Sequence, residues 1–203
     1  MRPKQRIGIM GGTFNPIHYG HLVAAEWSRE ALGLHKVFFT PSAQPPHKDA
    51  TEIVAAEHRL QMVRLALKDH AQFEALDIEI RRSGPSYTVD TLEELSRRLT
   101  HSELYFIMGM DSFLDLPEWR NPARIAEISR LVVVTRPGYS FQLDAAYDAI
   151  LPRPQEQLIQ LEIPGLHISS SNIRHRIASA QTVRYLLPAD VEAYIYHHQL
   201  YRK

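Results

Sequence analysis

The chain has 203 residues, which is enough for one α/β domain with a sizeable core and too few for two full-sized domains. Lysine and arginine together number 23, as do aspartate and glutamate, and this balance argues against a protein that holds nucleic acid by charge alone. Cysteine is absent, which excludes disulfides and thiolate nucleophiles, and no apolar run approaches the ~18 residues of a membrane-spanning helix. We therefore expect one cytoplasmic domain, 1–203, with neither nucleic acid nor a membrane as its partner.

Short apolar runs alternate with amphipathic stretches of helical length, a pattern typical of βαβ units in a parallel sheet. In chain order, the first half predicts a strand at 6–10, a helix at 19–32, a strand at 36–40, a helix at 55–69, a strand at 73–81 and a helix at 88–99. The second half predicts a strand at 104–108, helices at 112–116 and 122–128, strands at 131–135 and 158–163, and helices at 170–180 and 188–198. Segment 141–154 receives no assignment.

Local signals set several of these boundaries. Gly33 is expected to cap the end of the first helix, and a serine or threonine is expected to cap the start of helix 88–99. Segment 73–81 alternates apolar and charged residues, which predicts a half-buried strand near a sheet edge. Together the elements predict an α/β fold: a Rossmann-like open parallel sheet with helices on both faces and a small C-terminal helical part at about 169–203.

A glycine-rich segment, 11–21, lies between the first strand and the first helix. This is the place where open parallel sheets bind ligands, and the helix start offers unpaired N–H groups to an anion. The segment matches neither the Gly-x-Gly-x-x-Gly pattern of dinucleotide-binding proteins nor the Gly-x-x-x-x-Gly-Lys-Ser/Thr pattern of phosphate-binding loops. A phosphate site of another kind is therefore indicated.

Two histidines of this segment, His18 and His21, are three residues apart, so their rings share one face of the first helical turn, and Gly20 between them leaves room for a ligand beside the helix. Two imidazoles there could bind one phosphoryl group. Alternatively, His18 caps the turn and His21 only packs. A zinc site is a weaker alternative because no third ligand is nearby in the sequence. The position after a glycine turn favours the phosphate interpretation.

The segment Gly-Gly-Thr-Phe-Asn-Pro-Ile-His-Tyr-Gly-His at 11–21 and Ile-Ser-Ser-Ser-Asn-Ile-Arg at 168–174 resemble the nucleotidylyltransferase superfamily with its HxGH motif. Further stretches, in this order, are similar to the bacterial nicotinate-nucleotide adenylyltransferases of NAD biosynthesis: 45–48, 84–92, 106–111, 118–119, 136–138 and 194–201. These landmarks cover nearly the whole chain. Eight motifs in order at compatible spacing make the resemblance specific.

The resemblance implies that the 5′-phosphate of nicotinate mononucleotide attacks the α-phosphorus of ATP, giving nicotinate adenine dinucleotide and pyrophosphate with the help of Mg²⁺. No covalent enzyme intermediate is needed, because the acceptor phosphate is already an anion. ATP and nicotinate mononucleotide are the expected partners. Mg²⁺ is expected to be held mainly by the ATP phosphates, with no metal ligands from the protein. A homo-oligomer is left open.

The resemblance also implies which residues act on ATP, with His18, His21 and Arg174 as the catalytic residues. The residues expected to bind ATP are Gly11, Gly12, Thr13, Phe14, His18, His21, Gly109, Asp111, Ser170, Ser171 and Arg174. Taken alone, segment 169–174 also fits an ordinary serine-capped helix with a surface arginine, and Asp111 fits the N-cap of helix 112–116.

The acceptor nucleotide is expected to contact a second set of residues. These are Asn15, His47, Lys48, Tyr87, Thr88, Trp119 and Arg136. The indole of Trp119 can stack on a pyridine ring, and N–H groups at the helix start near Thr88 can hold its carboxylate. Plain core packing of Trp119 and a solvated Lys48 are the alternatives.

The sequence departs from the family pattern at two positions. Ser171 stands where threonine is common, and Asn15 stands where aspartate is frequent, which removes a negative charge beside the phosphate site. Three other functions compete with the adenylyltransferase. One is transfer to another acceptor, such as phosphopantetheine or nicotinamide mononucleotide; one is a nucleotide sensor without turnover; and one is RNA binding, which the balanced charge does not favour.

Overall fold

The computed structural model describes residues 4–45, 53–139 and 141–202. Six strands form one sheet in the order β3-β2-β1-β4-β5-β6, and the pairs β1–β4, β4–β5 and β5–β6 are parallel. The strands are β1 Gln5–Gly12, β2 Lys36–Pro41, β3 Phe73–Ala75, β4 Ser102–Gly109, β5 Ser129–Thr135 and β6 Leu158–Glu162. This strand order is that of doubly wound dinucleotide-binding folds, which confirms the expected fold class.

The helices follow the predicted order closely. They are α1 Tyr19–Leu32, α2 Ala56–Leu67, α3 Thr88–Arg98, α4 Met110–Leu114, α5 Pro122–Ile128, α6 Pro154–Gln157, α7 Ser170–Ala178 and α8 Ala189–His197. Two short 3₁₀ helices, Leu116–Glu118 and Ala145–Tyr147, complete the set among the described residues. None of the helices in the described ranges is long and apolar enough to span a membrane.

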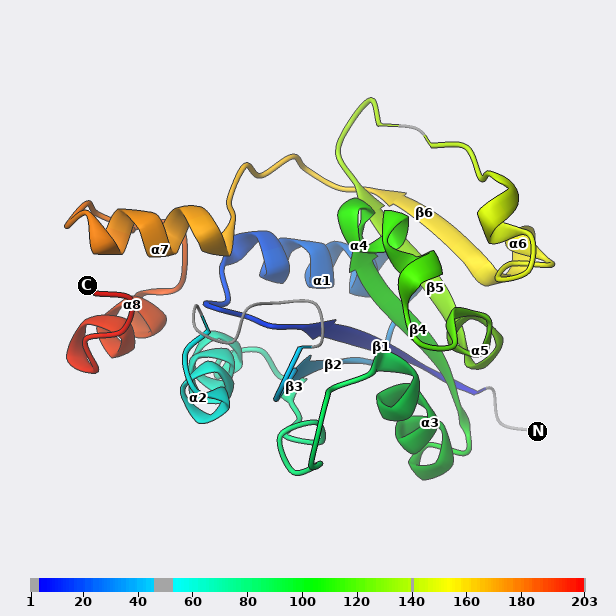
Figure 1. The fold of residues 1–203 in the computed structure, drawn as a ribbon, viewed down its shortest axis with the longest axis horizontal. Helices are drawn as coiled ribbons and strands as arrows, with labels where there is room; N and C mark the ends of the chain where they lie inside the picture. The colour runs from blue at the N-terminus through cyan, green and yellow to red at the C-terminus, as the bar shows by residue number, and fades with distance from the viewer. Residues whose placement is uncertain (1–3, 46–52, 140, 203) are drawn as a thin grey trace. The chain divides into compact units, whose positions relative to one another are not determined.

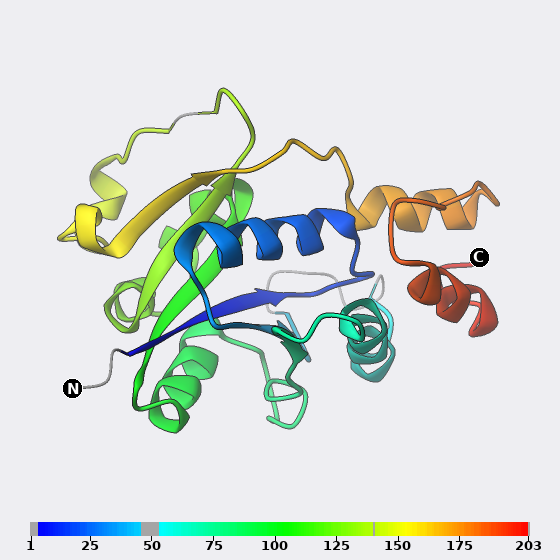
Figure 2. The same cartoon turned by 180° about the vertical axis from the view of Figure 1, so that it is seen from behind.

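The chain divides into two compact units. The first unit, which we call the sheet unit, comprises Met1–Gly11, Ala24–Phe38 and Tyr87–Gly165. Its core is the apolar pair of strands β4 and β5, where Leu131, Val132 and Val133 are completely buried. Strands buried on both faces are expected to read as continuous β-branched and aliphatic runs. Figures 1 and 2 show α1 on one side of this sheet and α3 on the other, as the sequence predicts.

The second unit, which we call the loop unit, comprises Gly12–Val23, Phe39–Ser86 and Leu166–Lys203. It contains α2, α7 and α8, the edge strand β3 and the long loop between β1 and α1. Helices α2 and α8 pack together, and the ion pair between Lys68 and Asp190 joins them at the surface. Irregular backbone makes up much of this unit, so its order depends on how the polar groups of that backbone are satisfied.

The strand predicted at 73–81 is wrong beyond its first 3 residues, because β3 ends at Ala75. The chain then turns, with the backbone N–H of Arg81 donating to the carbonyl of Asp77 at 2.9 Å. Consecutive residues Ile78 and Glu79 are both buried, which a half-buried strand with a period of two does not allow. The alternation of apolar and charged residues therefore came from a turn and not from a strand.

Two expected caps have different outcomes. Gly33 has a φ of +60° and its N–H donates to Glu30, which confirms it as the C-cap of α1. The expected serine or threonine cap of α3 is wrong, since the N-cap is Tyr87 without a side-chain hydrogen bond. Ser86 is used elsewhere: its hydroxyl accepts from the N–H groups of Ala43 and Gln44 at 2.9 and 3.3 Å.

Within the sheet unit, Gly11 and Gly109 lie at the same edge. Strands β1 and β4 are parallel neighbours with Met10 paired to Ile107, so the next residues of both strands reach the carboxyl edge together. This is the switch point of the strand order, where chain connections leave in opposite directions and ligands bind in doubly wound sheets. A Cβ placed on Gly109 would meet no atom within 4 Å, so packing within the chain does not require a glycine there.

Candidate active site

The loop that follows β1 is buried rather than open. Residues 13–18 are all buried, and Phe14 adopts a φ of +47°, a left-handed conformation that side chains rarely take. Both glycines, Gly11 and Gly12, belong to β1 and not to the expected turn. The turn therefore begins at Thr13, and its unusual backbone must be held by surrounding groups.

The two histidines come together at the start of α1. Their rings stack with centroids 3.8 Å apart, and the N–H groups of His21 and Leu22 donate to the carbonyl of His18 at 3.0 and 3.3 Å. The backbone N–H of His18 donates in return to Nδ1 of His21 at 3.2 Å. The His21 ring therefore takes the part that a Glu or Gln takes in a capping box, while the His18 Nδ1 makes no bond in return among the described residues. His18 is thus the N-cap, and the predicted pairing of the rings is confirmed.

The hydrogen bonds also determine which ring nitrogens carry protons. Because Nδ1 of His21 accepts, its proton lies on Nε2, which is therefore a donor. Nδ1 of His18 is buried with no hydrogen-bond partner among the described residues, and an unpaired acceptor costs less than an unpaired N–H. Nε2 is therefore the favoured protonated nitrogen in both rings. Burial lowers the pKa of His18 to about 4, so this ring is neutral at pH 7.

Gly20 has a different function from the one expected. A Cβ at this position would lie 3.0 Å from both Cε1 and Nδ1 of His18, closer than side chains normally approach. The absent side chain therefore makes room for the His18 ring. His21 is also fixed by Phe14, whose ring meets it edge-on at a centroid distance of 5.0 Å.

The serine motif of α7 binds this loop directly. The hydroxyl of Ser169 accepts from the N–H of Asn172 at 3.2 Å, so the predicted serine cap is confirmed. The hydroxyl of Ser170 donates to the carbonyl of Pro16 at 2.8 Å, and Nη1 of Arg174 donates to the carbonyl of Asn15 at 3.0 Å. The alternative of a mere surface arginine is wrong, because Arg174 is half-buried against the loop.

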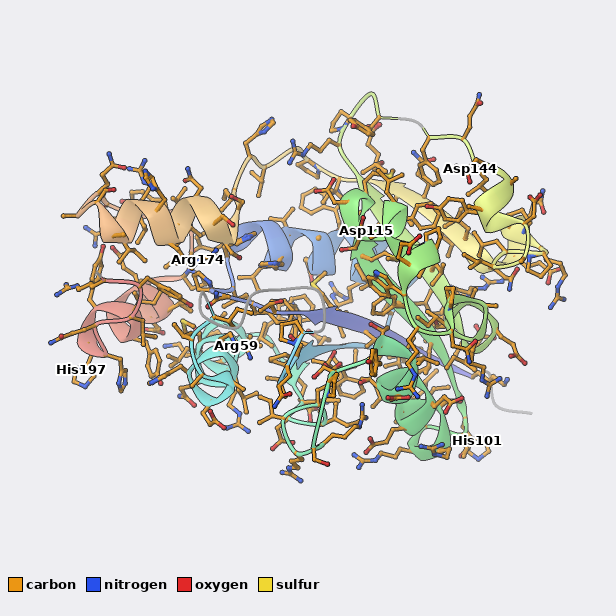
Figure 3. The ribbon with its side chains drawn as sticks, viewed as in Figure 1. Arg59, His101, Asp115, Asp144, Arg174 and His197 are labelled. Carbon is orange, nitrogen blue, oxygen red and sulfur yellow. The ribbon has the colours of Figure 1, made fainter. Side chains whose placement is uncertain are left out.

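Ser171, the third serine of the motif, is exposed and lies 3.5 Å from Nη2 of Arg174. Figure 3 labels Arg174 on α7 and Arg59 on α2. Two nitrogens of the Arg174 guanidinium thus contact the loop and the motif itself, Nη1 the carbonyl of Asn15 and Nη2 the hydroxyl of Ser171. The motif therefore both braces the loop and presents hydroxyl and guanidinium groups at the start of a helix.

Arg59 is a member of the site that the sequence analysis missed. It is only 1% exposed, and its three nitrogens donate to the carbonyls of Val54, Thr13 and Ala43 at 2.9, 2.8 and 3.1 Å. One side chain thus ties the loop after β1 to both described ends of the segment between β2 and α2. An arginine on the apolar side of a helical pattern is the signal that could have indicated it.

Tyr201, near the end of the chain, is a second residue that was missed. Its hydroxyl donates to Oδ1 of Asn15 at 2.9 Å, although the two residues are 186 positions apart. Burial raises the pKa of Tyr201 well above its ordinary value, although the positive charges of Arg174 and Arg59 act to lower it. Segment 194–201 carries part of the family resemblance, but no residue type in it points to contact with Asn15.

The other predicted residues lie in the sheet unit or outside the described ranges. Asp111 is exposed in the first turn of α4, which begins at Met110, so the alternative that Asp111 caps a helix at 112–116 is wrong. His47 and Lys48, with the rest of 46–52, lie outside the described residues. Thr88 is the first residue of α3, where N–H groups are unpaired, as expected.

Trp119 is half-buried, and its indole meets the ring of Phe106 edge-on at 6.2 Å. The guanidinium of Arg120 lies over the ring of Tyr87 at 4.6 Å. Arg136 is exposed just after β5. The aromatic groups predicted for base recognition are thus partly packed against the sheet unit and partly accessible.

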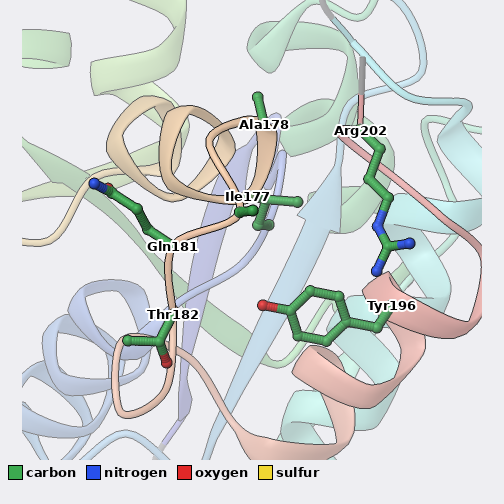
Figure 4. A pocket seen from close by; sticks show the side chains of 7 residues that line it. Ile177, Ala178, Gln181, Thr182, Tyr196 and Arg202 are labelled. Carbon is green, nitrogen blue, oxygen red and sulfur yellow. The ribbon is translucent and has the colours of Figure 1, made fainter.

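A separate cavity of about 670 Å³ lies in the loop unit, lined by Ile177, Thr182, Tyr196 and Arg202 among others (Figure 4). None of the residues predicted for the site lines it. It mixes apolar and polar groups and opens to solvent, and it takes no part in the arrangement around the histidine pair.

Comparisons with known proteins agree on one class. The family model described as cytidylyltransferase-like matches residues 9–176, and the chain belongs to this family. Probable nicotinate-nucleotide adenylyltransferases are similar over nearly the full length. The protein of Thermomicrobium roseum is 46% identical over 97% of this chain and 92% of its own, that of Roseiflexus is 47% identical over 97% and 98%, and that of Thermus thermophilus is 43% identical over 97% and 100%. Within the cytidylyltransferase-like family, the chain is a member of the nicotinate-nucleotide adenylyltransferases.

Solved structures show the same fold at low identity. The nicotinic acid mononucleotide adenylyltransferase of Plasmodium falciparum, complexed with APC or with NaAD, has a TM-score of 0.77 and 18% identity over 97% of both chains. A putative nicotinate-nucleotide adenylyltransferase from Vibrio parahaemolyticus has a TM-score of 0.67 and 17% identity over 98% of this chain and 96% of its own. The fold found here is therefore that of these solved structures.

Proposed function

We propose that this chain transfers the adenylyl group of ATP to nicotinate mononucleotide, forming nicotinate adenine dinucleotide and pyrophosphate in NAD biosynthesis. The observation that carries the proposal is the stacked histidine pair at the start of α1, in a chain 42–47% identical to relatives named for this reaction. An oxygen of the acceptor phosphate forms a bond to the α-phosphorus, and the bond from that phosphorus to the oxygen bridging to the β-phosphorus breaks. Pyrophosphate leaves with the electron pair of that bond.

The protein needs no nucleophile for this reaction, because the acceptor phosphate is already anionic at pH 7. Its tasks are to align the acceptor in line and to stabilise the charge that spreads over the phosphoryl oxygens. His18 and His21 would each donate one hydrogen bond from Nε2. A donor that is already oriented needs no reorganisation during the reaction, and the capping-box bond on His21 provides that orientation.

The remaining residues expected to bind ATP come from the end of β1 and the loop after it, the end of β4 and the start of α7. Gly11, Gly12, Thr13 and Phe14 would approach the nucleotide with their backbone, while Gly109 and Asp111 would contact it at the end of β4. Ser170, Ser171 and Arg174 would hold the β- and γ-phosphates and then the pyrophosphate. The start of α7 favours anions through its unpaired N–H groups, and Arg174 has donors beyond the one that holds Asn15.

Mg²⁺ would reach the site on the ATP phosphates. Within the described ranges, no three histidine, aspartate or glutamate residues are grouped so as to hold a metal ion. Mg²⁺ normally keeps several waters and binds mainly to substrate phosphates in such enzymes, so we expect the ion to arrive with the nucleotide. When bound, it would neutralise part of the triphosphate charge.

Recognition of the acceptor would come from a different set of residues. Thr88 at the start of α3 offers N–H groups to the nicotinate carboxylate, and the half-buried indole of Trp119 leaves part of its surface for the pyridine ring. The remaining members of the set would be Asn15, His47, Lys48, Tyr87 and Arg136. A preference for carboxylate over amide would follow from the helix start, which favours negative charge.

The direct test is pyrophosphate release by the purified protein with ATP and Mg²⁺. Nicotinate mononucleotide, nicotinamide mononucleotide and phosphopantetheine should be compared as acceptors. Rapid release with the first alone is the expected result. No pyrophosphate release with any of the three acceptors, together with measurable ATP binding, would indicate a nucleotide sensor instead.

His21→Ala tests the role of the histidine pair. We expect kcat to fall about 10² to 10³-fold, the usual effect of losing one oriented donor to a transition state, with a modest fall in the thermal midpoint because the N–H of His18 loses its acceptor. His101→Ala, at an exposed position before β4, is the matched control and should keep normal kcat. A His21→Ala protein with near-normal kcat would remove this ring from the transition state.

A further inference from the structure

Arg120, the residue after Trp119, places its charge at the start of α3. Its guanidinium lies over the ring of Tyr87 at 4.6 Å, and Nη1 lies 3.8 Å from Oδ2 of Asp90. Tyr87 is the N-cap of α3, and Asp90 is in its first turn. All of these residues belong to the sheet unit. Two contacts, one on the cap and one on the first turn, therefore locate a cation at this helix start.

The start of α3 also carries a negative charge. The N–H groups of Asp90 and Thr91 donate to the carbonyl of Tyr87 at 3.2 and 3.3 Å, while those of Thr88 and Val89 make no hydrogen bond among the described residues. A helix start attracts anions, and the Asp90 carboxylate is already one such anion. It would repel the carboxylate of a ligand bound at Thr88, because like charges this close destabilise each other.

Arg120 can offset this repulsion. The 3.8 Å separation is that of an ion pair and is too long for a hydrogen bond, so the guanidinium balances the Asp90 charge without donating to it. Both side chains are accessible, with 59% of Arg120 and 35% of Asp90 exposed. Their effects on a nearby ligand should therefore be moderate in size and reduced by salt.

We propose that Arg120 is a specificity-determining residue for the acceptor nucleotide. Its charge balances that of Asp90 at the start of α3, and this balance sets how strongly the site prefers a pyridine that carries a carboxylate over one that carries a neutral amide. The inference rests on the proposed function, in which the nicotinate carboxylate binds at Thr88 beside Trp119. It requires no hydrogen bond from Arg120 to the ligand.

The test is a pair of single substitutions with opposite expected signs. Arg120→Gln should raise KM for nicotinate mononucleotide about two- to fivefold, the range of an exposed charge interaction, and Asp90→Asn should lower it by a similar factor. Affinity for nicotinamide mononucleotide, measured as its inhibition constant against nicotinate mononucleotide, should change less than about twofold in both. KM for ATP should also stay within about twofold.

Three further variants separate charge from packing. The double variant Arg120→Gln/Asp90→Asn should return KM to within about twofold of wild type, because both charges are then absent. Arg120→Lys keeps the charge without the planar group over Tyr87, so its KM should also stay near that of wild type. The matched control is Arg124→Gln, since Arg124 is paired with Glu93 and Glu127 at 3.0 and 2.8 Å and not with the first turn of α3. This control should leave the preference unchanged.

Salt gives an independent measurement. The difference in KM between Arg120→Gln and Asp90→Asn should shrink as the ionic strength rises from about 0.05 to about 0.5 M, because exposed charges are screened. If Arg120→Gln and Asp90→Asn both weakened the two pyridine nucleotides alike, the pair would be a structural contact and the inference would be overturned. Unchanged constants in Arg120→Gln would overturn it while leaving the proposed function intact. Wild-type protein that does not turn over nicotinate mononucleotide would overturn both.

Discussion

Each of the two units is stabilised internally by a different kind of interaction. In the sheet unit, β5 pairs with β4 in a parallel ladder, and the apolar side chains at its centre are completely buried. In the loop unit, residues 13–18 are equally buried, yet the groups that hold them are polar. Arg59, Ser170 and Arg174 donate to the carbonyls of three loop residues. Burial alone therefore does not tell how a segment is fixed.

The difference has a consequence for function. Apolar packing has no preferred direction at the level of single bonds, and it tolerates small shifts at modest cost. Hydrogen bonds lose strength steeply when their geometry changes, so they fix the position of a loop more sharply. We expect substitutions in the sheet unit to change stability first, and substitutions around the loop to change activity as well.

Arg59→Met should have the largest effect. It removes the donors of three carbonyls, each of which costs about 1 kcal/mol or more when left unpaired, so the free energy of unfolding should fall by about 3 kcal/mol. Activity should be lost with it. Arg64→Met on the same helix is the control, because Arg64 is exposed and forms only a 3.9 Å ion pair with Asp77. Denaturant unfolding of both variants measures the difference, and equal losses would contradict a special role for Arg59.

Two glycine substitutions place the same methyl group in the two units. The Cβ of Gly8→Ala would lie 2.9 Å from Cδ1 of Leu34 and 3.0 Å from Cγ2 of Val37, both buried in the sheet unit. We expect a loss of about 1 kcal/mol in stability and near-normal kcat. The Cβ of Gly20→Ala would lie 3.0 Å from the His18 ring, which is buried and stacked on His21.

For Gly20→Ala we therefore expect kcat to fall about 10²-fold, because the added methyl group displaces the His18 ring. The free energy of unfolding should change by less than the activation free energy does. Steady-state kinetics and thermal unfolding of both alanine variants make the comparison. If Gly8→Ala lost as much activity as Gly20→Ala, the separation between the two units would be wrong.

Most of the sheet unit was predictable from the sequence. Helix 122–128 has the predicted bounds, and the strands around 104–108 and 131–135 differ from prediction only in length, because continuous apolar runs and a proline at a helix start are local signals. The strand predicted at 73–81 failed because apolar residues spaced by two also occur in a buried turn. Periodicity does not distinguish these cases without knowledge of what packs on each face.

In the loop unit, the sequence motifs were predictable, and the long-range hydrogen bonds that hold the loop were not. His18, His21 and Ser169 could be found because they lie close together in sequence beside a helix start. Arg59 and Tyr201 contact loop residues that are 46 and 186 positions away in the sequence. Arg59 binds a backbone carbonyl, and Tyr201 binds the side-chain amide of an asparagine, both of which are common groups. Such partners leave no signature in a single sequence, since any carbonyl can accept.

The smallest predicted effect concerns pH and the burial of His18. Its pKa is lowered to about 4 in the folded protein and is about 6.5 in the unfolded chain, so between these values the unfolded state binds more protons. The stability that the neutral ring contributes is present above pH 6.5 and is lost as the pH falls toward 4. Between pH 7 and 5.5 the loss should be about 1 kcal/mol.

The measurement is denaturant unfolding at both pH values, compared between the wild type and His18→Gln. The glutamine removes this titration and leaves the others in place, including that of His198, whose pKa is also lowered by burial and by its neighbours His197 and His58. The difference between the two proteins therefore isolates His18. An equal pH dependence in both would show that the ring is solvated in solution, and the orphaned Nδ1 would then be paired with water and not buried.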